Sequence, residues 1–350
     1  MRRRIITSSG GNSTDYSTKY LTFVASESGT FQFSGTGISY SLDEGNTWTS
    51  LAADTATPTV AAGSSIMWKG TIKPGTSPPQ GIGTFSSTGN FTAEGNPMCL
   101  LFGDEFEGET DLTGKNYAFY RLFYNCTKLT SINNLVLPAT TLATYCYQYM
   151  FSNCSSLTSI PSGFLPATTL VAWCYQYMFQ NCSSLTAAPE LPATTLAGYC
   201  CNHMFSYCTS LTTVPSTLSA TTLATYCYSY MFYGCTSLTT APTLPATTLA
   251  QYCYQYMFSD CTSLTTAPIL PAITLTRQCY AYMFNGCSSL SYIKAMFTTT
   301  PQTTTTTRQT YNWVKGVAAS GTFVKNSAAT WTTTGVNGVP SGWTVQTASS

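Results

Sequence analysis

The sequence predicts a mixed α/β fold: a solenoid of short strands and short helices, placed between an N-terminal all-β module and a small C-terminal cap. The main reason is a motif, Met-Phe-x-x-Cys-(Ser/Thr)-Ser-Leu, that returns every 26–28 residues. It begins at Met150, Met178, Met204, Met231, Met257 and Met283, with a weaker copy from Leu122. Such a period is typical of solenoids, whose units bury their apolar faces against one another. The second reason is composition, because 43% of the residues are hydrophobic and only 8% are charged.

Changes in pattern divide the 350 residues into six segments. In chain order these are a flexible N-terminal lead (1–19), an all-β module (20–101), an acidic joint (102–115), the solenoid (116–294), a Thr-rich linker (295–309) and a C-terminal cap (310–350). The lead opens with three arginines after Met1 but lacks the apolar core of a secretory signal, so we expect no export by that route. No apolar run reaches the roughly 20 residues that a membrane span needs.

The all-β module contains short alternating stretches separated by Gly, Asp and Pro, the pattern of β-strands. We expect strands at 20–24, 30–33, 37–41, 65–68 and 83–85, packed as a small sandwich.

One stretch of the module, Ser41-Leu-Asp-Glu-Gly-Asn-Thr-Trp48, resembles the Asp-box hairpin of sialidase-like propellers. In that motif the Asp and Ser side chains bond to turn amides and the Trp fills the core. A propeller would need several copies and this chain has one, so we expect a structural turn and not a sialidase site.

The acidic joint holds the one acidic cluster of the sequence, with carboxylates at Asp104, Glu105, Glu107, Glu109 and Asp111. These groups could bind calcium, or two of them could supply the acid and base of a glycoside hydrolase. We favour a third interpretation, a solvated joint that covers the open end of the solenoid, because no partner acid or histidine accompanies the cluster.

An apolar stripe predicts a short helix in each repeat. In residues 142–154 the positions i, i+1, i+4, i+5, i+8, i+9 and i+12 carry the apolar side chains, whereas Thr144, Gln148 and Ser152 fall opposite. We therefore expect a helix of two to three turns.

A brief strand should follow each helix. In the copy at 237–249, Leu238, Ala241 and Leu244 are spaced to face inward. Pro242 removes one backbone donor, so this strand should not exceed a few residues.

Twelve of the fifteen cysteines form six pairs with members eight residues apart, from Cys146 and Cys154 to Cys279 and Cys287. They fall where the repeat needs a small inward-facing apolar residue, a role that a free thiol fills. We expect reduced, stacked thiols, with some disulfides or a metal site as the alternatives. The absence of Cys-x-x-Cys and the presence of one histidine leave zinc fingers without donors.

The repeats resemble the BspA-type (treponemal-type) leucine-rich repeats, in which a Met-Phe or Ala-Phe pair precedes x-x-Cys, Ser-Leu-Thr and an Ile/Leu-Pro turn. This chain departs from that pattern in the additional Cys of each repeat, where the family usually has Ile, and in its Tyr-Cys-Tyr-x-Tyr runs. The resemblance implies a leucine-rich-repeat solenoid with a binding role. That family is associated with surface adhesins of anaerobic gut and oral bacteria, and similar repeats occur in proteins of their phages.

Two aromatic positions in each repeat, one and five residues before the Met, are the candidate binding site. They should stack into a two-lane aromatic stripe made of Tyr145, Tyr149, Trp173, Tyr177, Tyr199, His203, Tyr226, Tyr230, Tyr252, Tyr256 and Tyr282. Between residues 130 and 290 only Glu190, Asp260 and Arg277 are charged. A neutral surface rich in Tyr, Ser and Thr has the composition of an antibody paratope and suits a glycan or a protein. The alternative is that the stripe only stabilises the solenoid by packing copy on copy.

The last segment should close the open end of the solenoid, which such arrays require. We expect a final strand at 292–297, a helix around 311–317 and a strand at 322–325, with Trp313 and two later tryptophans, Trp331 and Trp343, as the plug.

These observations predict a non-enzymatic binding or structural protein without a cofactor. The sequence has no Gly-rich phosphate loop and no histidine paired with a Ser or Cys nucleophile. A net charge of +1 gives no electrostatic case for nucleic acid.

We expect a fibre or adsorption component of a phage virion. Its N-terminal module would contact other virion proteins, its solenoid would contact a host-surface glycan or protein, and it could form a homo-oligomer. A bacterial cell-surface adhesin is the main alternative, and a glycan-active enzyme is the third.

Overall fold

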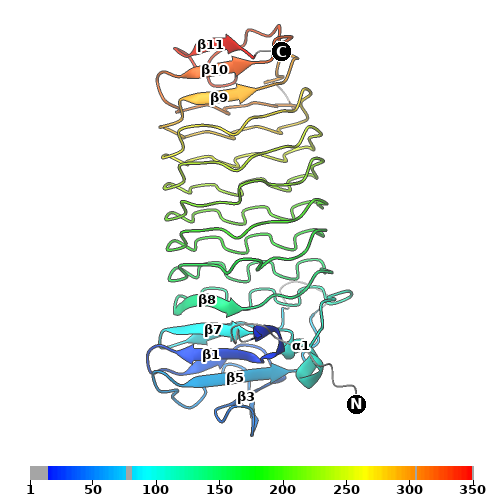
Figure 1. Cartoon of the computed structure of the whole chain (residues 1–350), viewed down its shortest axis with the longest axis vertical. Helices are drawn as coiled ribbons and strands as arrows, with labels where there is room; N and C mark the ends of the chain where they lie inside the picture. The colour runs from blue at the N-terminus through cyan, green and yellow to red at the C-terminus, as the bar shows by residue number, and fades with distance from the viewer. Residues whose placement is uncertain (1–14, 76–80, 304–305, 349–350) are drawn as a thin grey trace, which may run out of the picture.

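The computed structural model describes residues 15–75, 81–303 and 306–348, which form a sheet-rich base and a long stack of coils above it (Figure 1). The elements are η1 (Tyr16–Thr18), β1 (Leu21–Ala25), β2 (Phe31–Phe33), β3 (Ile38–Ser41), β4 (Thr49–Leu51), β5 (Ser65–Gly70), β6 (Phe85–Ser87), β7 (Phe91–Gly95), α1 (Cys99–Phe102), η2 (Gly103–Glu105), β8 (Leu129–Leu135), β9 (Tyr292–Ala295), β10 (Thr322–Lys325) and β11 (Thr344–Thr347). Among these described segments, no helix has the length and hydropathy to cross a bilayer.

The base is a six-stranded sheet of order β4-β3-β5-β1-β7-β8, with the small sheet β2-β6 beside it. The aromatic rings of Phe31 and Phe85, from the small sheet, lie 5.4 and 4.8 Å from that of Phe23 in the large one. The sequence located β1, β2, β3 and β5 but missed β4 and β7, and the strand predicted at 83–85 overlaps β6 only at Phe85. Of the predicted flexible lead, residues 1–14 lie outside the described part of the chain, and η1 forms where Asp15 accepts the Ser17 amide at 3.0 Å.

The base and the stack share one sheet. Strand β8 belongs to the first repeat and pairs in parallel with β7, so that Phe91 lies opposite Leu129. All the other pairs in that sheet are antiparallel. The first coil therefore hydrogen-bonds to a strand that the base provides.

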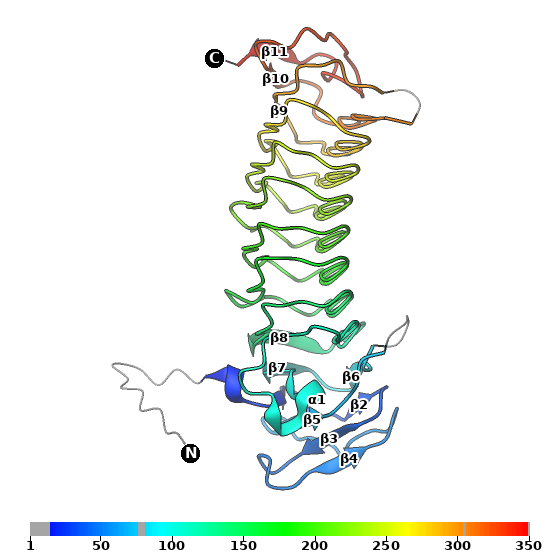
Figure 2. The same cartoon turned by 90° about the vertical axis from the view of Figure 1, so that its right-hand side faces the viewer.

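The predicted helix of each repeat is wrong. Residues 143–154 and their counterparts in the other repeats form overlapping turns, which we call the turn run of each coil. Among the described residues, α1 in the base is the one α-helix. Figure 2 shows the turn runs as the folded loops along one side of the stack.

Hydrogen bonds in a turn run alternate between the run itself and the next coil. The Met178 amide donates to the Tyr175 carbonyl, three residues earlier in the same coil, at 3.2 Å. The Tyr177 amide donates to the Asn202 carbonyl of the next coil at 3.0 Å. An α-helix would instead direct every such bond to the carbonyl four residues earlier in its own segment. A coil of this stack therefore completes its hydrogen bonding only with a neighbour.

This path requires positive φ at every fourth residue. Tyr145, Tyr149 and Asn153 have φ of 62°, 58° and 64°. Each is the third residue of a turn closed by a bond between the first and fourth residues, where a type II turn places its left-handed residue. In the sequence, the pairs of apolar residues in each repeat recur every 4 residues, whereas one turn of an α-helix takes 3.6 residues. This difference is the sequence signal against a helix.

The predicted short strands reduce to single bridges in the middle coils. Thr240 pairs in parallel with Thr266, and Leu238 and Leu244 face inward, as expected. Pro242 lacks the amide that a longer ladder would use, so strands of several residues appear only at the two ends of the stack (Figure 1).

Ladders of like side chains fill the interior. The rings of Phe151, Phe179 and Phe205 are nearly parallel, with successive centroids 5.3 and 5.5 Å apart. The Met before each of these residues is fully buried. Every coil therefore presents the same apolar shape to the next one.

The fifteen cysteines are free and buried. The second thiol of each pair donates to a Phe carbonyl of the preceding coil, as Cys208 does to Phe179 at 3.1 Å and Cys235 to Phe205 at 3.2 Å. A disulfide would remove this donor, so the thiol form completes the packing. Burial raises the pKa of the Cys182 and Cys235 thiols to about 12.

The stack continues beyond the predicted end of the repeats. The Tyr282 amide donates to the Tyr311 carbonyl at 2.8 Å, so residues 308–316 form another turn run. The helix predicted around residues 311–317 is therefore wrong for the same reason, and Asn312 and Gly316 have positive φ. Strands β10 and β11 extend β9 as a parallel sheet.

The end of the chain covers the last turn run. The Asn312 amide donates to Oδ1 of Asn337 at 2.7 Å, and the Val314 amide donates to the Val336 carbonyl at 3.3 Å. The indole N–H groups of the three C-terminal tryptophans, Trp313, Trp331 and Trp343, each donate to a backbone carbonyl at 2.8–3.1 Å. These contacts close the C-terminal end of the stack, the role that the sequence predicted for the three tryptophans.

The buried thiols make a direct test of the stack. Because thiolate is the reactive form, and because all these thiols are buried and burial raises the pKa of groups such as Cys182 and Cys235, we expect a thiol reagent at pH 8 to leave the native protein almost unmodified. In denaturant all fifteen cysteines should react. Mass spectrometry after timed labelling measures both states, and rapid modification of several thiols in the folded protein would contradict this packing.

Candidate functional site

The predicted aromatic residues lie in two ladders on the turn runs. Lane one begins at Tyr117, which the sequence analysis left out, and its rings stack in the order Tyr117, Tyr145, Trp173, Tyr199, Tyr226 and Tyr252. Neighbouring centroids are 4.3–5.7 Å apart, and the ring planes differ by no more than 17°. Lane one is thus a continuous column of rings.

Lane two has the same construction. Its rings stack in the order Tyr149, Tyr177, His203, Tyr230, Tyr256 and Tyr282, with centroids 4.2–4.7 Å apart. The structure therefore places all the predicted stripe residues in one of the two lanes. We keep the name aromatic stripe for both lanes together.

A shared backbone conformation aligns the lanes. Every predicted stripe residue has φ between 56° and 62°. Because each coil hydrogen-bonds to the next in the same register, equal φ values send the side chains in the same direction. The left-handed positions therefore produce the ladders.

Stacking occupies the ring faces. Inside each lane, a ring has a neighbour on both sides, and the ring at the C-terminal end of each lane has a further contact. The Arg277 guanidinium lies 5.5 Å from the Tyr252 centroid, and the Tyr311 ring meets Tyr282 at 74°. The stripe residues are only partly exposed, so ring edges and phenolic hydroxyls form its outer surface. Face-on stacking of a sugar is therefore not open to the rings inside the lanes.

Polar side chains beneath the stripe bond along the stack. Gln148 donates to Gln176, Gln176 donates to Asn202 at 2.9 Å, and Asn202 donates to the Ser229 carbonyl at 3.0 Å. These residues are buried or nearly so. They hold the coils in register and are not available to a ligand.

His203 takes the place of a tyrosine in lane two. Its ring lies between those of Tyr177 and Tyr230, and its Nδ1 is buried without a hydrogen-bond partner. Burial lowers the pKa of His203 to about 4, so the ring is neutral at pH 7. The nearby Ser206 hydroxyl donates to the His203 backbone carbonyl, and no described nucleophile is hydrogen-bonded to the imidazole.

Three residues of this surface were missed from the sequence: Tyr117, Arg121 and Tyr311. Counting five and one residues back from Leu122, the Met equivalent of the weak first copy, gives Tyr117 and Arg121. Tyr311 lies in a segment predicted to be part of the cap. Extending the repeat spacing to the weak first copy would therefore have identified Tyr117 and Arg121 from the sequence.

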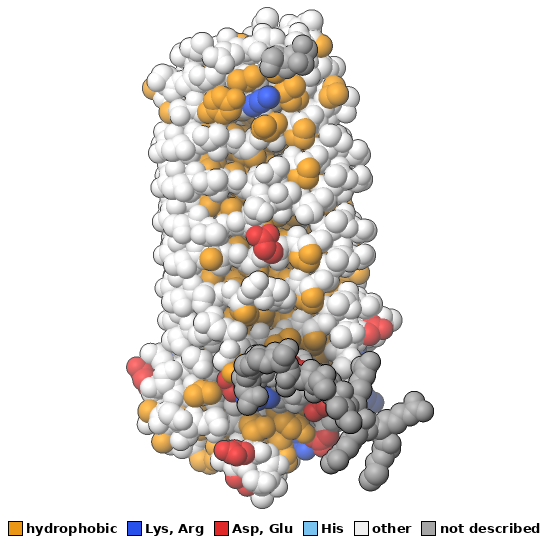
Figure 3. Space-filling model, viewed as in Figure 1, with side chains coloured by type: hydrophobic (Ala, Val, Ile, Leu, Met, Phe, Trp, Pro, Cys, Tyr) orange, Lys and Arg blue, Asp and Glu red, His pale blue; other side chains and the backbone are white. Residues whose placement is uncertain are grey.

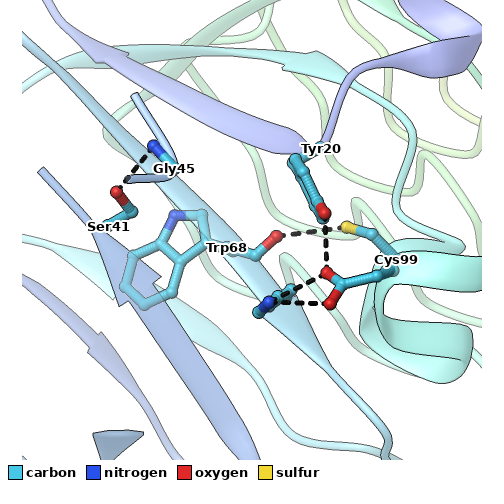
Figure 4. A network of polar contacts seen from close by, with 7 residues as sticks. Tyr20, Ser41, Gly45, Trp68 and Cys99 are labelled. Atoms are coloured by element: carbon cyan, nitrogen blue, oxygen red, sulfur yellow. Dashed lines mark hydrogen bonds and ion pairs between the residues drawn. The ribbon is translucent and has the colours of Figure 1, made fainter. Parts of the chain in front are cut away.

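The acidic joint is tied to the base by Asp104. Its carboxylate pairs with Lys69 at 2.8 Å and accepts the Tyr20 hydroxyl at 2.6 Å, and these hydrogen bonds lower its pKa (Figure 4). Beside it the Cys99 thiol donates to the Trp68 carbonyl at 3.2 Å. In the described ranges, no group of three or more His, Cys, Asp or Glu residues could hold a metal ion. Asp104 therefore has a structural partner on each side.

The Asp-box stretch forms the turn between β3 and β4. Oγ of Ser41 accepts the Gly45 amide at 2.9 Å, and Oδ1 of Asp43 accepts the Thr47 amide at 2.9 Å. Trp48 is half-buried against Tyr20, with ring centroids 5.1 Å apart, and does not fill the core as expected.

Replacing His203 by tyrosine tests the stacking of lane two. The unfolded chain holds this imidazole near its ordinary pKa of about 6.5, so between that pH and pH 4 the unfolded state binds more protons than the folded state. Stability due to the neutral ring is therefore lost as the pH falls. We expect the free energy of unfolding of the wild type to drop by on the order of 2–3 kcal/mol more than that of His203→Tyr over this range.

Urea titrations of both proteins at pH 7 and pH 4.5 measure this difference. Carboxylates titrate in both proteins, so the comparison isolates the imidazole. Equal pH dependence of the two would show that His203 is solvated in the folded state.

Comparison with known proteins places the repeats in a family. The BspA type leucine rich repeat region matches residues 116–231 and 174–306, in six copies. Together these ranges cover more than half of the chain. No curated protein matches the sequence. The resemblance inferred from the repeat motif is thus confirmed, and the chain belongs to the BspA-type leucine-rich repeat family.

Proposed function

We propose that this protein is a non-enzymatic binding protein in which a leucine-rich-repeat solenoid acts as a rigid spacer and contact surface, carried on a phage virion as a fibre or adsorption component. Membership in a repeat family of the surface and adhesin type supports the binding role. The uncharged exterior of the stack is the observation that carries the proposal.

Charge is distributed unevenly over the molecule. On the face seen in Figure 3, acidic and basic side chains gather over the base, while the stack above is almost free of them. A neutral surface rich in hydroxyl groups lacks long-range electrostatic attraction and selects partners by shape and hydrogen bonding. This is the behaviour expected of a contact surface presented to one particular host structure.

The thiols support assembly in a reducing compartment. All fifteen are buried, and the second of each pair serves as a hydrogen-bond donor between coils. Such proteins fold where thiols stay reduced, as in the cytosol in which phage particles assemble.

The aromatic stripe is the proposed contact surface for a host glycan or protein. Since its ring faces are covered, it would bind through phenolic hydroxyls and ring edges, groups that form hydrogen bonds at low conformational cost. The base would attach the protein to the particle, because β4 is the outermost strand of its sheet, at the end away from the stack.

A bacterial cell-surface adhesin is the second candidate, and the family itself favours it. Both candidates use the stack for binding. They differ in the body that carries the protein.

Locating the protein separates the two candidates. Particles purified by density gradient and analysed by quantitative mass spectrometry should contain the protein at a constant ratio to the major structural proteins. Detection only in bacterial envelope fractions would exclude the virion role and favour the adhesin.

The role of the stripe is tested by removing hydroxyls without removing rings. We expect the combined variant Tyr226→Phe, Tyr230→Phe, Tyr252→Phe and Tyr256→Phe to keep its thermal midpoint within a few degrees and to bind host cells at least about 10-fold more weakly, since each lost hydrogen bond contributes about 1 kcal/mol. Thr212→Val with Thr240→Val, away from the stripe, is the matched control. Unchanged binding by the tyrosine variant would leave the stripe a purely structural ladder.

A further inference from the structure

We propose that β11, at the C-terminal end of the stack, pairs with β11 of a second copy of the chain, so that two solenoids join tail to tail. The inference goes beyond the proposed function and does not rest on it, because it concerns the end of the stack that lies away from the base. It assigns a surface to the homo-oligomer that the sequence analysis expects.

Strand β11 has a partner on one side. It pairs in parallel with β10, and among the described residues no strand pairs with its other side. Figures 1 and 2 show it at the opposite end of the stack from the base. All four of its residues are exposed, whereas β9 and β10 each have two buried residues. The stack therefore ends in an open strand edge.

The side chain of Val345 shows that the interior is uncovered at this edge. In the register of the sheet, Val345 lies beside Phe323, and Phe323 lies beside Ile293. Side chains at equal positions of neighbouring strands share one face of a sheet. Phe323 and Ile293 are fully buried, but Val345 is 49% exposed. Val345 therefore continues an inward-facing apolar column that has no further coil to cover it.

Two residues of β11 direct their backbone groups away from β10. The Thr344 amide donates to the Gly321 carbonyl at 2.9 Å and therefore points toward β10. Successive residues of a strand bond to opposite sides, so the N–H and C=O groups of Val345 and Thr347 point outward. In an antiparallel pair, residues opposite each other exchange both hydrogen bonds. With Gln346 of both copies on a two-fold axis, each Val345 would exchange both bonds with Thr347 of the second copy.

Nothing in β11 blocks such pairing. Strand edges that remain unpaired usually carry a charged side chain, a proline or a bulge. The sequence of β11, Thr-Val-Gln-Thr, includes no charged residue and no proline, and its register with β10 is unbroken. Pairing with another strand would also continue the arrangement of the stack, in which each coil completes its hydrogen bonding with a neighbour.

The distribution of charge favours a second copy as the partner. Residues 326–350 include no Lys, Arg, Asp, Glu or His. A two-fold axis brings identical groups together, so a charged end would repel its copy, whereas a neutral end does not. The other end of the stack is covered by β7 of the base, where charged side chains gather (Figure 3). The stack therefore has no second open end for a head-to-tail chain, and association stops at a dimer.

Sedimentation velocity of the full chain over a range of concentrations measures this association. We expect a reversible equilibrium between monomer and dimer. Small-angle scattering of the dimer should show a particle much longer than the monomer, because tail-to-tail pairing places the two bases at opposite ends. A dimer with the length of the monomer and a larger cross-section would contradict the proposal.

Two substitutions in β11 should weaken the dimer. Thr347→Pro removes an outward amide and leaves the bonds to β10 in place, since proline is tolerated on the open side of an edge strand. The dimer then loses a hydrogen bond on each side of the two-fold axis, so we expect its dissociation constant to rise at least about 10-fold. Val345→Lys places like charges near the axis and should have the same effect. Leu42→Lys is the matched control, because it adds the same charge at a base residue of similar exposure, 48%, and should leave the dimer unchanged.

Hydrogen exchange of the wild type tests the pairing without a variant. The Val345 and Thr347 amides should exchange more slowly at concentrations at which the dimer forms, while the Thr344 amide, already bonded to Gly321, should not change. The proposal is overturned by unchanged exchange at both amides, by full dimerisation of the folded β11 variants, or by a protein that stays monomeric at its highest soluble concentration. A monomer would leave the edge of β11 to a strand of a different protein. None of these results bears on the location of the protein in particles.

Discussion

Every second amide of a turn run bonds outside its own coil, and the rest of the stack depends on this constraint. Closing the alternate turns brings a residue with positive φ to every fourth position, and most of these residues are aromatic. A left-handed conformation costs a side-chain-bearing residue on the order of 1 kcal/mol. Bonds to the next coil offset that cost at every such position, and ring stacking adds to them where the residue is aromatic.

The same constraint sets the inner and outer surfaces. With coils held in one register, equal positions stack on equal positions, which gives the Phe ladder inside and the aromatic stripe outside. It also explains the second cysteine of each pair, whose thiol reaches a Phe carbonyl of the preceding coil. Because equal positions stack on equal positions, the same type of side chain recurs along the whole surface. Residues that differ, such as Arg121 and His203, are local exceptions to this pattern.

Much of this arrangement could be predicted from the sequence, because burial and repeat spacing do not depend on the local conformation. The inward Met, Phe and Cys positions and the members of the stripe follow from counting residues. The helix could not be rejected on apolar pattern alone, since spacings of 3.6 and 4 diverge by little over three turns, and tyrosine rarely adopts positive φ. Coverage of the ring faces and the burial of the Arg121 Nε depend on neighbours far apart in the chain, which a single sequence does not place.

The direction of the bonds between turn runs gives the stack a polarity. Amides of one turn run donate to carbonyls of the run that follows it in the chain, as Tyr177 does to Asn202 and Tyr282 to Tyr311. During synthesis, the newest coil therefore exposes a row of unsatisfied donors until its successor emerges from the ribosome. The row of donors ends at the C-terminal cap, where Asn337 and Val336 accept amides of the last turn run. A chain interrupted before this cap would carry an adhesive end, ready to join whatever carbonyl edge it met.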